Sequence, residues 1–245
     1  MSVAPTQPVK RLTVAVLDGA DTRPSRIAAR AERADTKSRS KNATRRALDL
    51  LVATLLVLVA APVMILIAFA VRLDSKGPVL FRQRRVGRGQ REFTMLKFRT
   101  MRRDADAARH RQYVQTLIDG ADNPERGRLY KLSVDDRITR IGRVLRSWSL
   151  DELPQLLNVI RGDMALVGPR PVIPYEVEMY PEDYLRRFAV KPGLTGLWQV
   201  SGRNERTYEE MVSFDIQYAE SASLLLDLLI LAKTVPVVLR RQGVA

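Results

Sequence analysis

Two adjacent carboxylates, Asp151 and Glu152, stand near the middle of the 245-residue chain, in the run Ser149-Leu150-Asp151-Glu152-Leu153-Pro154-Gln155. Carboxylate oxygens are preferred ligands of divalent cations such as Mg²⁺, and an oxygen left free can act as a nucleophile. The pair also has a structural interpretation, because Ser149 and Glu152 have the spacing of a helix capping box and acidic residues favour the first turn of a helix. The pattern alone therefore predicts either a catalytic pair or a helix start.

A single arginine between two prolines follows the acidic pair. In Gly168-Pro169-Arg170-Pro171 the prolines restrict the backbone, and an arginine fixed in this way suits bidentate binding of phosphate. A plain rigid turn would explain the prolines but would not require Arg170. The run from Lys191 to Asn204 then combines turn formers with polar groups, which is more typical of a binding loop than of a connection.

An uncharged stretch of 22 residues, Leu50 to Val71, must lie near these loops if the chemistry occurs at a membrane. It is long enough to span a bilayer, which needs roughly 20 apolar residues. Both of its flanks are basic, however, and short basic flanks tend to stay on the cytoplasmic side. Pro62 interrupts the middle of the stretch, where proline kinks or breaks a helix. A re-entrant helix explains both features, and a single span with a proline kink is the alternative.

The remaining elements predict a mainly α fold with a small β-hairpin. Residues 79–101 contain two β-prone runs around a basic turn, and the glycines of that turn form no phosphate-binding fingerprint. Residues 102–148 read as mainly helical, and Ile138 to Trp148 has the apolar spacing of a basic amphipathic helix. This helix and the stretch Leu224 to Leu239 could lie in a membrane interface, although a domain helix with a solvated face explains the first equally well.

Charge and composition narrow the classes of partner. The formal net charge of +14 divides into +7 for residues 1–46, −1 for 47–71, +11 for 72–150 and −3 for 151–245. Positive charge clustered around an apolar stretch suits binding to anionic lipids or phosphorylated substrates. Judged by charge alone, nucleic acid is an equally good partner. The chain has no cysteine, which excludes disulfides and thiolate chemistry. The only histidine, His110, stands in a charged run typical of a solvated helix face.

Several motifs together resemble the bacterial sugar transferase family, the monotopic phosphoglycosyl transferases or polyprenyl-phosphate hexose-1-phosphate transferases, in their small exopolysaccharide-type form. The similarity runs from about Arg45 to Val244. It rests on Arg46-Ala47-Leu48-Asp49, Lys97-Phe98-Arg99-Thr100-Met101, the run around Asp151 and Glu152, Gly168-Pro169-Arg170-Pro171, and Pro192-Gly193-Leu194-Thr195-Gly196.

The resemblance implies a fold in which a re-entrant membrane helix and interfacial amphipathic helices surround a cytoplasmic catalytic domain. It divides the chain into a flexible basic tail (1–44), a re-entrant helix broken near Pro62 (45–73) and a phosphoglycosyl transferase domain (74–245). The protein would lie on the cytoplasmic face of the bacterial inner membrane. The tail lacks the order of charge, apolar core and small residues that marks a signal peptide.

The implied reaction transfers a sugar 1-phosphate from a UDP-sugar to polyprenyl (undecaprenyl) phosphate and releases UMP, with Mg²⁺ as cofactor. Asp151 would be the nucleophile, Glu152 its partner, and both would be metal ligands. Lys97, Arg99, Arg170 and Arg203 would bind phosphate, Asp215 and Asp227 would be further acidic residues of the active-site region, and Arg46, Asp49 and Pro62 would fix the re-entrant helix.

Departures from the family pattern are modest: Arg45-Arg46 replaces a Lys-Arg pair, Ala61 replaces a serine before Pro62, and a longer helical insert is expected around residues 104–131. Two other classes of function compete. A non-catalytic adaptor would use the basic surface to bind anionic lipids but leaves Asp151, Glu152 and Arg170 unexplained. A nucleic-acid binder would interleave aromatic with basic residues, yet aromatics make up 6% of the chain. The sugar (glucose, galactose or an N-acetylated sugar) and a homodimer stay open.

Overall fold

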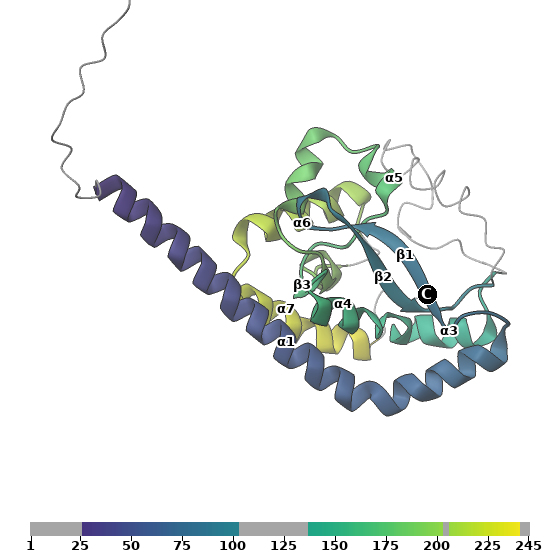
Figure 1. The fold of residues 1–245 in the computed structure, drawn as a ribbon. Coiled ribbons are helices and arrows are strands. Elements are labelled where there is room, and N and C mark those ends of the chain that lie inside the picture. Colours follow the sequence, from purple (N-terminus) through teal and green to yellow (C-terminus); the bar gives the residue numbers. More distant parts are fainter. Residues whose placement is uncertain (1–25, 103–136, 203–205, 241–245) are drawn as a thin grey trace, which may run out of the picture. The chain divides into compact units, whose positions relative to one another are not determined.

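The computed structural model describes residues 26–102, 137–202 and 206–240, with only the backbone described for 26–41. The chain divides into two compact units, residues 1–40 and 41–245. The fold of the second unit is mainly helical with two small sheets, which confirms the predicted fold class in outline (Figure 1). The predicted insert around 104–131, His110 and Arg203 lie outside the described residues.

The first helix, α1 (Arg26–Asp74), begins within the segment expected to be a tail and contains the whole apolar stretch with Pro62 inside it. Its part from Asn42 to Asp74 is long and apolar enough to cross a membrane. In Figure 1 the helix changes direction within this part, as expected where proline removes a hydrogen bond and crowds the preceding turn. The helix is therefore bent without being broken into two helices.

The predicted hairpin is present. Strands β1 (Leu80–Val86) and β2 (Glu92–Phe98) pair antiparallel, with Leu80 opposite Phe98 and Val86 opposite Glu92. The turn between them contains the short 3₁₀ helix η1 (Arg88–Gln90), in which Gly89 and Gln90 take positive φ angles of 63° and 59°. Glycine adopts that conformation without steric cost, which explains why a turn this tight can form.

Helices and a second small sheet follow the hairpin. They are α3 (Arg140–Ser147), η2 (Leu150–Glu152), α4 (Gln155–Arg161), β3 (Ala165–Val167), α5 (Pro174–Val177), η3 (Glu182–Ala189), β4 (Gly193–Thr195), η4 (Trp198–Val200), α6 (Tyr208–Ser221) and α7 (Leu224–Leu239). Strands β3 and β4 pair in parallel, with Val167 opposite Thr195. The helices predicted from Ile138 to Trp148 and from Leu224 to Leu239 correspond to α3 and α7. The second sheet was not predicted.

Both halves of α1 contribute to the hydrophobic core. Ala53, before Pro62, is fully buried with Leu156, Val159 and Leu166. Ile67 and Val71, after Pro62, are buried with Phe98 and Leu145. The two halves of the apolar stretch are therefore packed against one domain.

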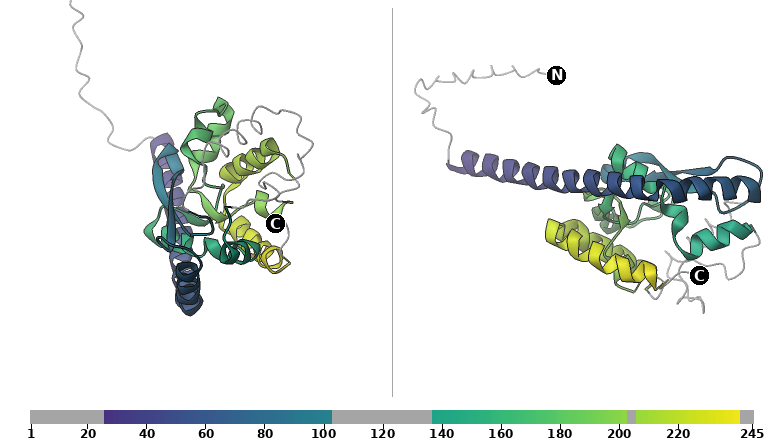
Figure 2. Two further views of the ribbon diagram at one scale, coloured as in Figure 1. Left: turned by 90° about the vertical axis from the view of Figure 1, so that its right-hand side faces the viewer. Right: turned by 90° about the horizontal axis from the view of Figure 1, so that it is seen from below.

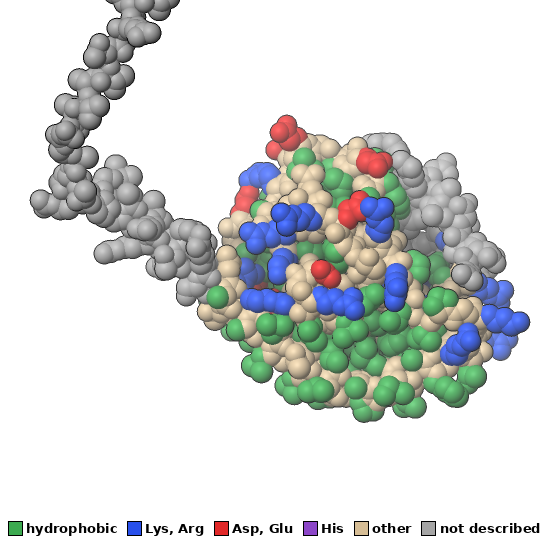
Figure 3. Space-filling view, in the orientation of Figure 1, with side chains coloured by type: hydrophobic (Ala, Val, Ile, Leu, Met, Phe, Trp, Pro, Cys, Tyr) green, Lys and Arg blue, Asp and Glu red, His purple; other side chains and the backbone are tan. Residues whose placement is uncertain are grey.

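The other faces of α1, α3 and α7 leave large apolar side chains exposed. Seen from below in Figure 2, these three helices lie toward the viewer, and Figure 3 shows hydrophobic side chains gathered along the lower part of the molecule beneath a row of Lys and Arg. We call this the apolar face. Its members include Leu51, Leu58, Ile65, Phe69, Val144, Trp148, Leu225 and Leu229, each at least 42% exposed.

Candidate active site

The acidic pair lies on the 3₁₀ turn η2 and not at the start of a regular helix. Ser149 precedes it in the left-handed conformation (φ 54°), and its side chain caps no backbone N–H. The capping-box interpretation is therefore wrong for Ser149 and Glu152. Glu152 instead accepts a hydrogen bond at 2.9 Å from Nζ of Lys97 on β2.

Asp151 is 9% exposed, while the side chain of Glu152 is 39% exposed. Burial raises the pKa of Asp151, because removal from water disfavours the charged carboxylate; nearby Lys97 lowers the pKa and the like charge of Glu152 raises it again. A weakly solvated carboxylate beside a cation has the environment of an activated nucleophile. The pair thus differs in environment, as two groups with different tasks would.

The position of η2 is fixed by apolar contacts on either side of the pair. Leu150 and Leu153 pack into the cluster formed by Ile67 and Val71 of α1 with Phe98 and Leu145. Lys97 is carried next to the pair because it directly precedes Phe98 on β2, and alternate residues of a strand point to opposite faces. The turn that carries Asp151 and Glu152 is therefore packed, through the leucines on either side of the pair, against the second half of the apolar helix.

The Gly168–Pro171 loop, predicted to bind phosphate, is held by hydrogen bonds to its backbone. The N–H of Gly168 donates to Thr195 O, and Pro169 O accepts from the N–H of Gly193, both at 2.9 Å. Two buried guanidinium groups support the rest of the loop: Arg187 donates to Arg170 O at 3.0 Å and Arg85 donates to Pro171 O at 2.9 Å. Such a loop presents the half-buried side chain of Arg170 from a fixed backbone.

A fully buried ion pair lies behind this loop. Arg187 donates to Asp215, and the two side chains are 0% and 1% exposed. Burial raises the pKa of Asp215 to about 6, while Arg187 and the backbone N–H of Arg170 oppose the rise, so that the carboxylate is ionised at neutral pH. Asp215 was predicted as an active-site acid. The structure places it where it supports the backbone of Arg170.

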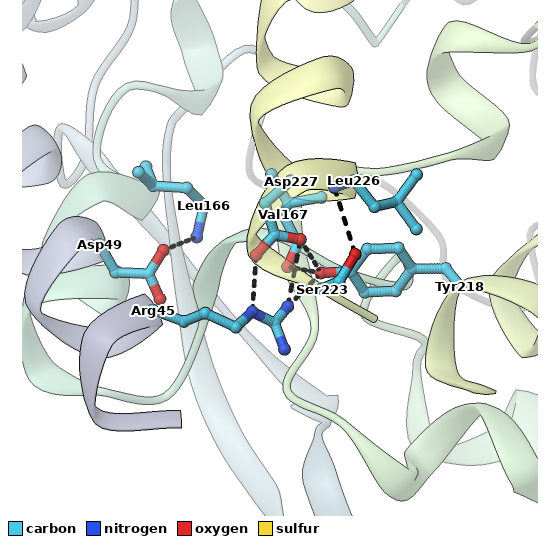
Figure 4. Close-up of polar contacts among 8 residues, drawn as sticks. All are labelled: Arg45, Asp49, Leu166, Val167, Tyr218, Ser223, Leu226 and Asp227. Atoms are coloured by element: carbon cyan, nitrogen blue, oxygen red, sulfur yellow. Dashed lines mark hydrogen bonds and ion pairs between the residues drawn. The ribbon is translucent and has the colours of Figure 1, made fainter. Parts of the chain in front are cut away.

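Three charged residues of α1, just before the apolar stretch begins, attach the helix to the domain. Arg46 donates to Val159 O at 2.6 Å and to Ile160 O at 2.8 Å, in the last turn of α4. Asp49 accepts from the N–H of Leu166 on β3 at 3.0 Å, and Arg45 pairs with Asp227 of α7 (Figure 4). Asp227, also predicted as an active-site acid, therefore connects α7 to α1.

The end of α1 is also attached to the domain. Arg99 donates to Ser75 O at 2.6 Å and, more weakly, to Val71 O at 3.4 Å, which satisfies carbonyl groups that a helix end leaves without partners. Asp74 accepts from the N–H of Ile141 in the first turn of α3. Arg99 is thus buried against α1, and its predicted role in binding phosphate stays a prediction.

Sequence reasoning missed Arg85, Arg187 and Tyr218 as residues that shape the site. Arg85 and Arg187 belong to a basic excess of 41 Lys and Arg residues, and nothing in their neighbours separates a buried arginine from a solvated one. Tyr218 stands in an ordinary helical pattern. Arg45 was noticed only as a departure from a Lys-Arg pair.

Comparison with known proteins shows the class to which this fold and site belong. The model of the family described as "Bacterial sugar transferase" matches residues 40–241, and the chain belongs to that family. The match covers α1 from just before Asn42, the acidic pair, the Gly168–Pro171 loop and α7.

The chain is similar to curated members of the family over most of its length. It is 42% identical to the exopolysaccharide production protein ExoY of Rhizobium meliloti (strain 1021) over 81% of this chain and 87% of that protein. It is 43% identical to the UDP-glucose:undecaprenyl-phosphate glucose-1-phosphate transferase of Caulobacter vibrioides over 78% and 68%. It is also 42% identical to the undecaprenyl-phosphate galactose phosphotransferase of Salmonella typhimurium, over 84% of this chain and 42% of that one.

Proposed function

We propose that this protein transfers a sugar 1-phosphate from a UDP-sugar to undecaprenyl phosphate and releases UMP, as the first membrane step of exopolysaccharide assembly. The observation that carries the proposal is a buried carboxylate, Asp151, beside Glu152 and Lys97, on a turn that packs against an apolar helix. The names of the relatives from Caulobacter and Salmonella support it, since both specify undecaprenyl phosphate, the first with glucose 1-phosphate and the second as a galactose phosphotransferase.

The reaction proceeds in two displacements at phosphorus. A carboxylate oxygen of Asp151 attacks the phosphorus that bears the sugar, the bond to the UMP phosphate breaks, and an aspartyl phosphosugar remains on the enzyme. An oxygen of undecaprenyl phosphate then attacks the same phosphorus. That step breaks the acyl phosphate bond, restores the Asp151 carboxylate and forms the lipid diphosphosugar.

Cationic groups must neutralise the diphosphate before a carboxylate can approach it. Lys97 contacts the pair through Glu152, and we propose that Arg170, whose backbone is held in the fixed loop, is a second phosphate contact. The described residues contain no group of three or more His, Cys, Asp or Glu side chains that could hold a metal. Two carboxylates nevertheless suit Mg²⁺, which keeps several waters and binds substrate phosphates. When bound by Asp151 and Glu152, Mg²⁺ would supply further charge neutralisation.

The attachment of both ends of the apolar stretch of α1 to one domain supports the re-entrant arrangement. Arg46 and Asp49 bind α4 and β3 at the start of the apolar stretch, and Asp74 binds α3 at its end. A straight span of about 22 residues would separate those ends by roughly 33 Å, across the hydrocarbon core. With the bend in the middle, both ends lie on the side where the nucleotide sugar is found, which we propose is the cytoplasmic face.

The apolar face supports contact with lipid along several helices. Scattered exposed leucines are common on soluble proteins, but a continuous apolar surface of this kind marks a membrane or partner contact. A row of Lys and Arg lies just above it (Figure 3), where anionic headgroups would meet a peripheral protein. The lipid phosphate would then reach Asp151 from the bilayer surface.

A panel of UDP-sugars tests the proposal. Purified protein in lipid nanodiscs is incubated with undecaprenyl phosphate, Mg²⁺ and one UDP-sugar at a time, and released UMP is measured. We expect UMP from at least one sugar, its loss on removal of Mg²⁺ by chelation, and a phosphosugar adduct on Asp151 by mass spectrometry.

Asp151→Asn is the matched variant, since it keeps the shape of the side chain and removes the nucleophilic charge. We expect it to release no UMP and to form no adduct while it still sediments with membranes. Normal turnover by this variant, or an adduct on another residue, contradicts the assignment. Salt-sensitive liposome binding without turnover of any sugar would favour the adaptor.

A further inference from the structure

Tyr218, on α6, lies where three other elements of the described chain meet. Its hydroxyl is 2.6 Å from Oδ1 of Asp227 on α7, 3.0 Å from the carbonyl oxygen of Val167 at the end of β3, and 2.6 Å from Nη2 of Arg45 on α1. The tyrosine is fully buried and Asp227 nearly so. Figure 4 shows the three side chains converging beside Val167.

The hydroxyl has one proton and two acceptors. A tyrosine O–H donates a single hydrogen bond, so Asp227 and Val167 O compete for it. A carboxylate is the stronger acceptor when it is free. Here Asp227 already accepts from Nε of Arg45 at 2.6 Å and from Nη2 at 3.1 Å, which neutralises its charge. Burial raises the pKa of Tyr218 far above its usual range, so the proton is always present to be shared.

Val167 O belongs to the peptide group that leads directly into Gly168. A hydrogen bond to this carbonyl therefore also orients the Gly168–Pro171 loop. The loop is held elsewhere by hydrogen bonds from β4, Arg85 and Arg187. The Tyr218 contact also continues to α1, because the same hydroxyl accepts a hydrogen bond from Arg45.

We propose that Arg45, Asp227 and Tyr218 are positioning residues that orient the Gly168–Pro171 loop when α1 is seated on the domain. With Arg45 paired to Asp227, the Tyr218 hydroxyl is shared between Oδ1 of Asp227 and the carbonyl oxygen of Val167, so that the carbonyl keeps a donor. When Arg45 leaves, Asp227 takes the tyrosine proton and the loop loses that support. The kinetic part of this inference rests on the proposed function, in which Arg170 of the loop contacts the substrate phosphate.

The direct test compares Tyr218→Phe with the wild type in lipid nanodiscs. Phenylalanine fills the same space and removes only the hydroxyl. We expect backbone amide hydrogen exchange across residues 165–171 to become roughly tenfold faster, and kcat/KM for the UDP-sugar to fall by about fivefold to tenfold. Exchange in the β1–β2 hairpin should not change.

Ser223→Ala is the matched control. Ser223 caps α7 through the N–H of Leu226, four residues before Asp227, and it takes no part in the network. Loss of the cap weakens α7 by an amount comparable with the loss of one buried hydrogen bond. We expect this variant to lower thermal stability while it leaves exchange at 165–171 and kcat/KM as in the wild type. Equal effects of Ser223→Ala and Tyr218→Phe on the loop would show that any loss of stability loosens it. That result would overturn the proposal.

A double-mutant comparison tests whether Arg45 acts through Tyr218. Arg45→Met alone should speed loop exchange about as much as Tyr218→Phe, and Arg45→Lys should restore part of the protection. In the Tyr218→Phe background, Arg45→Met should add little. Additive effects overturn the proposal, as does unchanged loop exchange in Tyr218→Phe. Because exchange is measured without substrate, it decides the network even if no UDP-sugar releases UMP, a result that would contradict only the proposed function.

Discussion

At the scale of single residues, arginine side chains bind backbone carbonyls throughout the described part of the chain. Arg46 holds the end of α4, Arg99 holds the end of α1, and Arg187 holds the carbonyl of Arg170. The planar guanidinium group suits this task because it donates several hydrogen bonds in fixed directions and remains charged when buried. Part of the basic excess therefore serves the fold and not a phosphate or lipid partner.

The buried pair of Arg187 and Asp215 makes a prediction at this scale. Asp215→Asn leaves a buried guanidinium group without its counter-charge, and we expect the free energy of unfolding to fall by about 3–5 kcal/mol. Chemical denaturation in detergent measures it. A change below about 1 kcal/mol would show that the pair is dispensable.

Replacement of both partners separates stability from function. Arg187→Met with Asp215→Leu removes both charges together, so we expect the double variant to recover much of the stability lost by Asp215→Asn. It should not recover kcat/KM, because Arg187 also donates to Arg170 O and Asp215 accepts from the N–H of Arg170. Recovery of both properties would show that the pair does not support the loop.

The candidate catalytic and phosphate-binding residues could be predicted from the sequence, but the buried residues that hold them in place could not. Asp151, Glu152 and Arg170 stand in short runs of unusual composition, which is a local signal. Arg85, Arg187 and Tyr218 act on residues 86, 17 and 51 positions away, respectively, and only the folded chain reveals such contacts. The same limit explains why the Ser149 capping box was wrong: its spacing fits, but the left-handed backbone at Ser149 and the attraction of Lys97 for Glu152 prevent it.

At the scale of elements, α3 lies so close to the strand end after β2 that only glycine fits between them. A Cβ atom added at Gly142 would lie 2.1 Å from the carbonyl oxygen of Thr100, a backbone atom that cannot move aside. The N–H of Thr139 donates to the same oxygen at 3.0 Å. The close approach therefore fixes α3, and through it the η2 turn, which begins three residues after α3 ends.

Gly142→Ala should displace α3 and with it the acidic pair. We expect a loss of about 1–3 kcal/mol in the free energy of unfolding and a decrease in UMP release larger than this loss of stability explains. Gly89→Ala is the control, because a Cβ there meets no atom within 4 Å and only the positive φ is strained. Gly89→Ala should be somewhat less stable and fully active; equal activity of the two variants would contradict the prediction.

The elements with strong periodicity were predictable, and the shortest were not. The apolar run of α1, the hairpin and the leucine-rich α7 each extend over enough residues to show a pattern. Strands β3 and β4 have three residues each and are joined by pairing across more than twenty residues. Their pairing depends on close packing of Gly168 against Gly193, which no local pattern indicates.

At the scale of the whole molecule, the proposed topology places both ends of the apolar stretch on one side of the membrane. The chain has no cysteine, so single cysteines can be introduced at the exposed positions Asn42 and Lys76. We expect a membrane-impermeant maleimide to label both variants in inside-out vesicles and neither in intact spheroplasts. Labelling of the two positions from opposite sides would contradict the re-entrant helix and leave a single kinked span.

The burial of α1 residues within the catalytic domain has a consequence for how this protein can be handled and regulated. Ala53, Ile67 and Val71 fill the interior beside Leu156, Phe98 and Leu145, so the apolar helix is also part of the hydrophobic core of the domain. We expect cleavage after Asp74 to remove these contacts from the interior and to destabilise the remaining domain. A cell that clips this anchor would therefore switch the protein off, and protein production strategies must retain the helix together with a lipid or detergent around it.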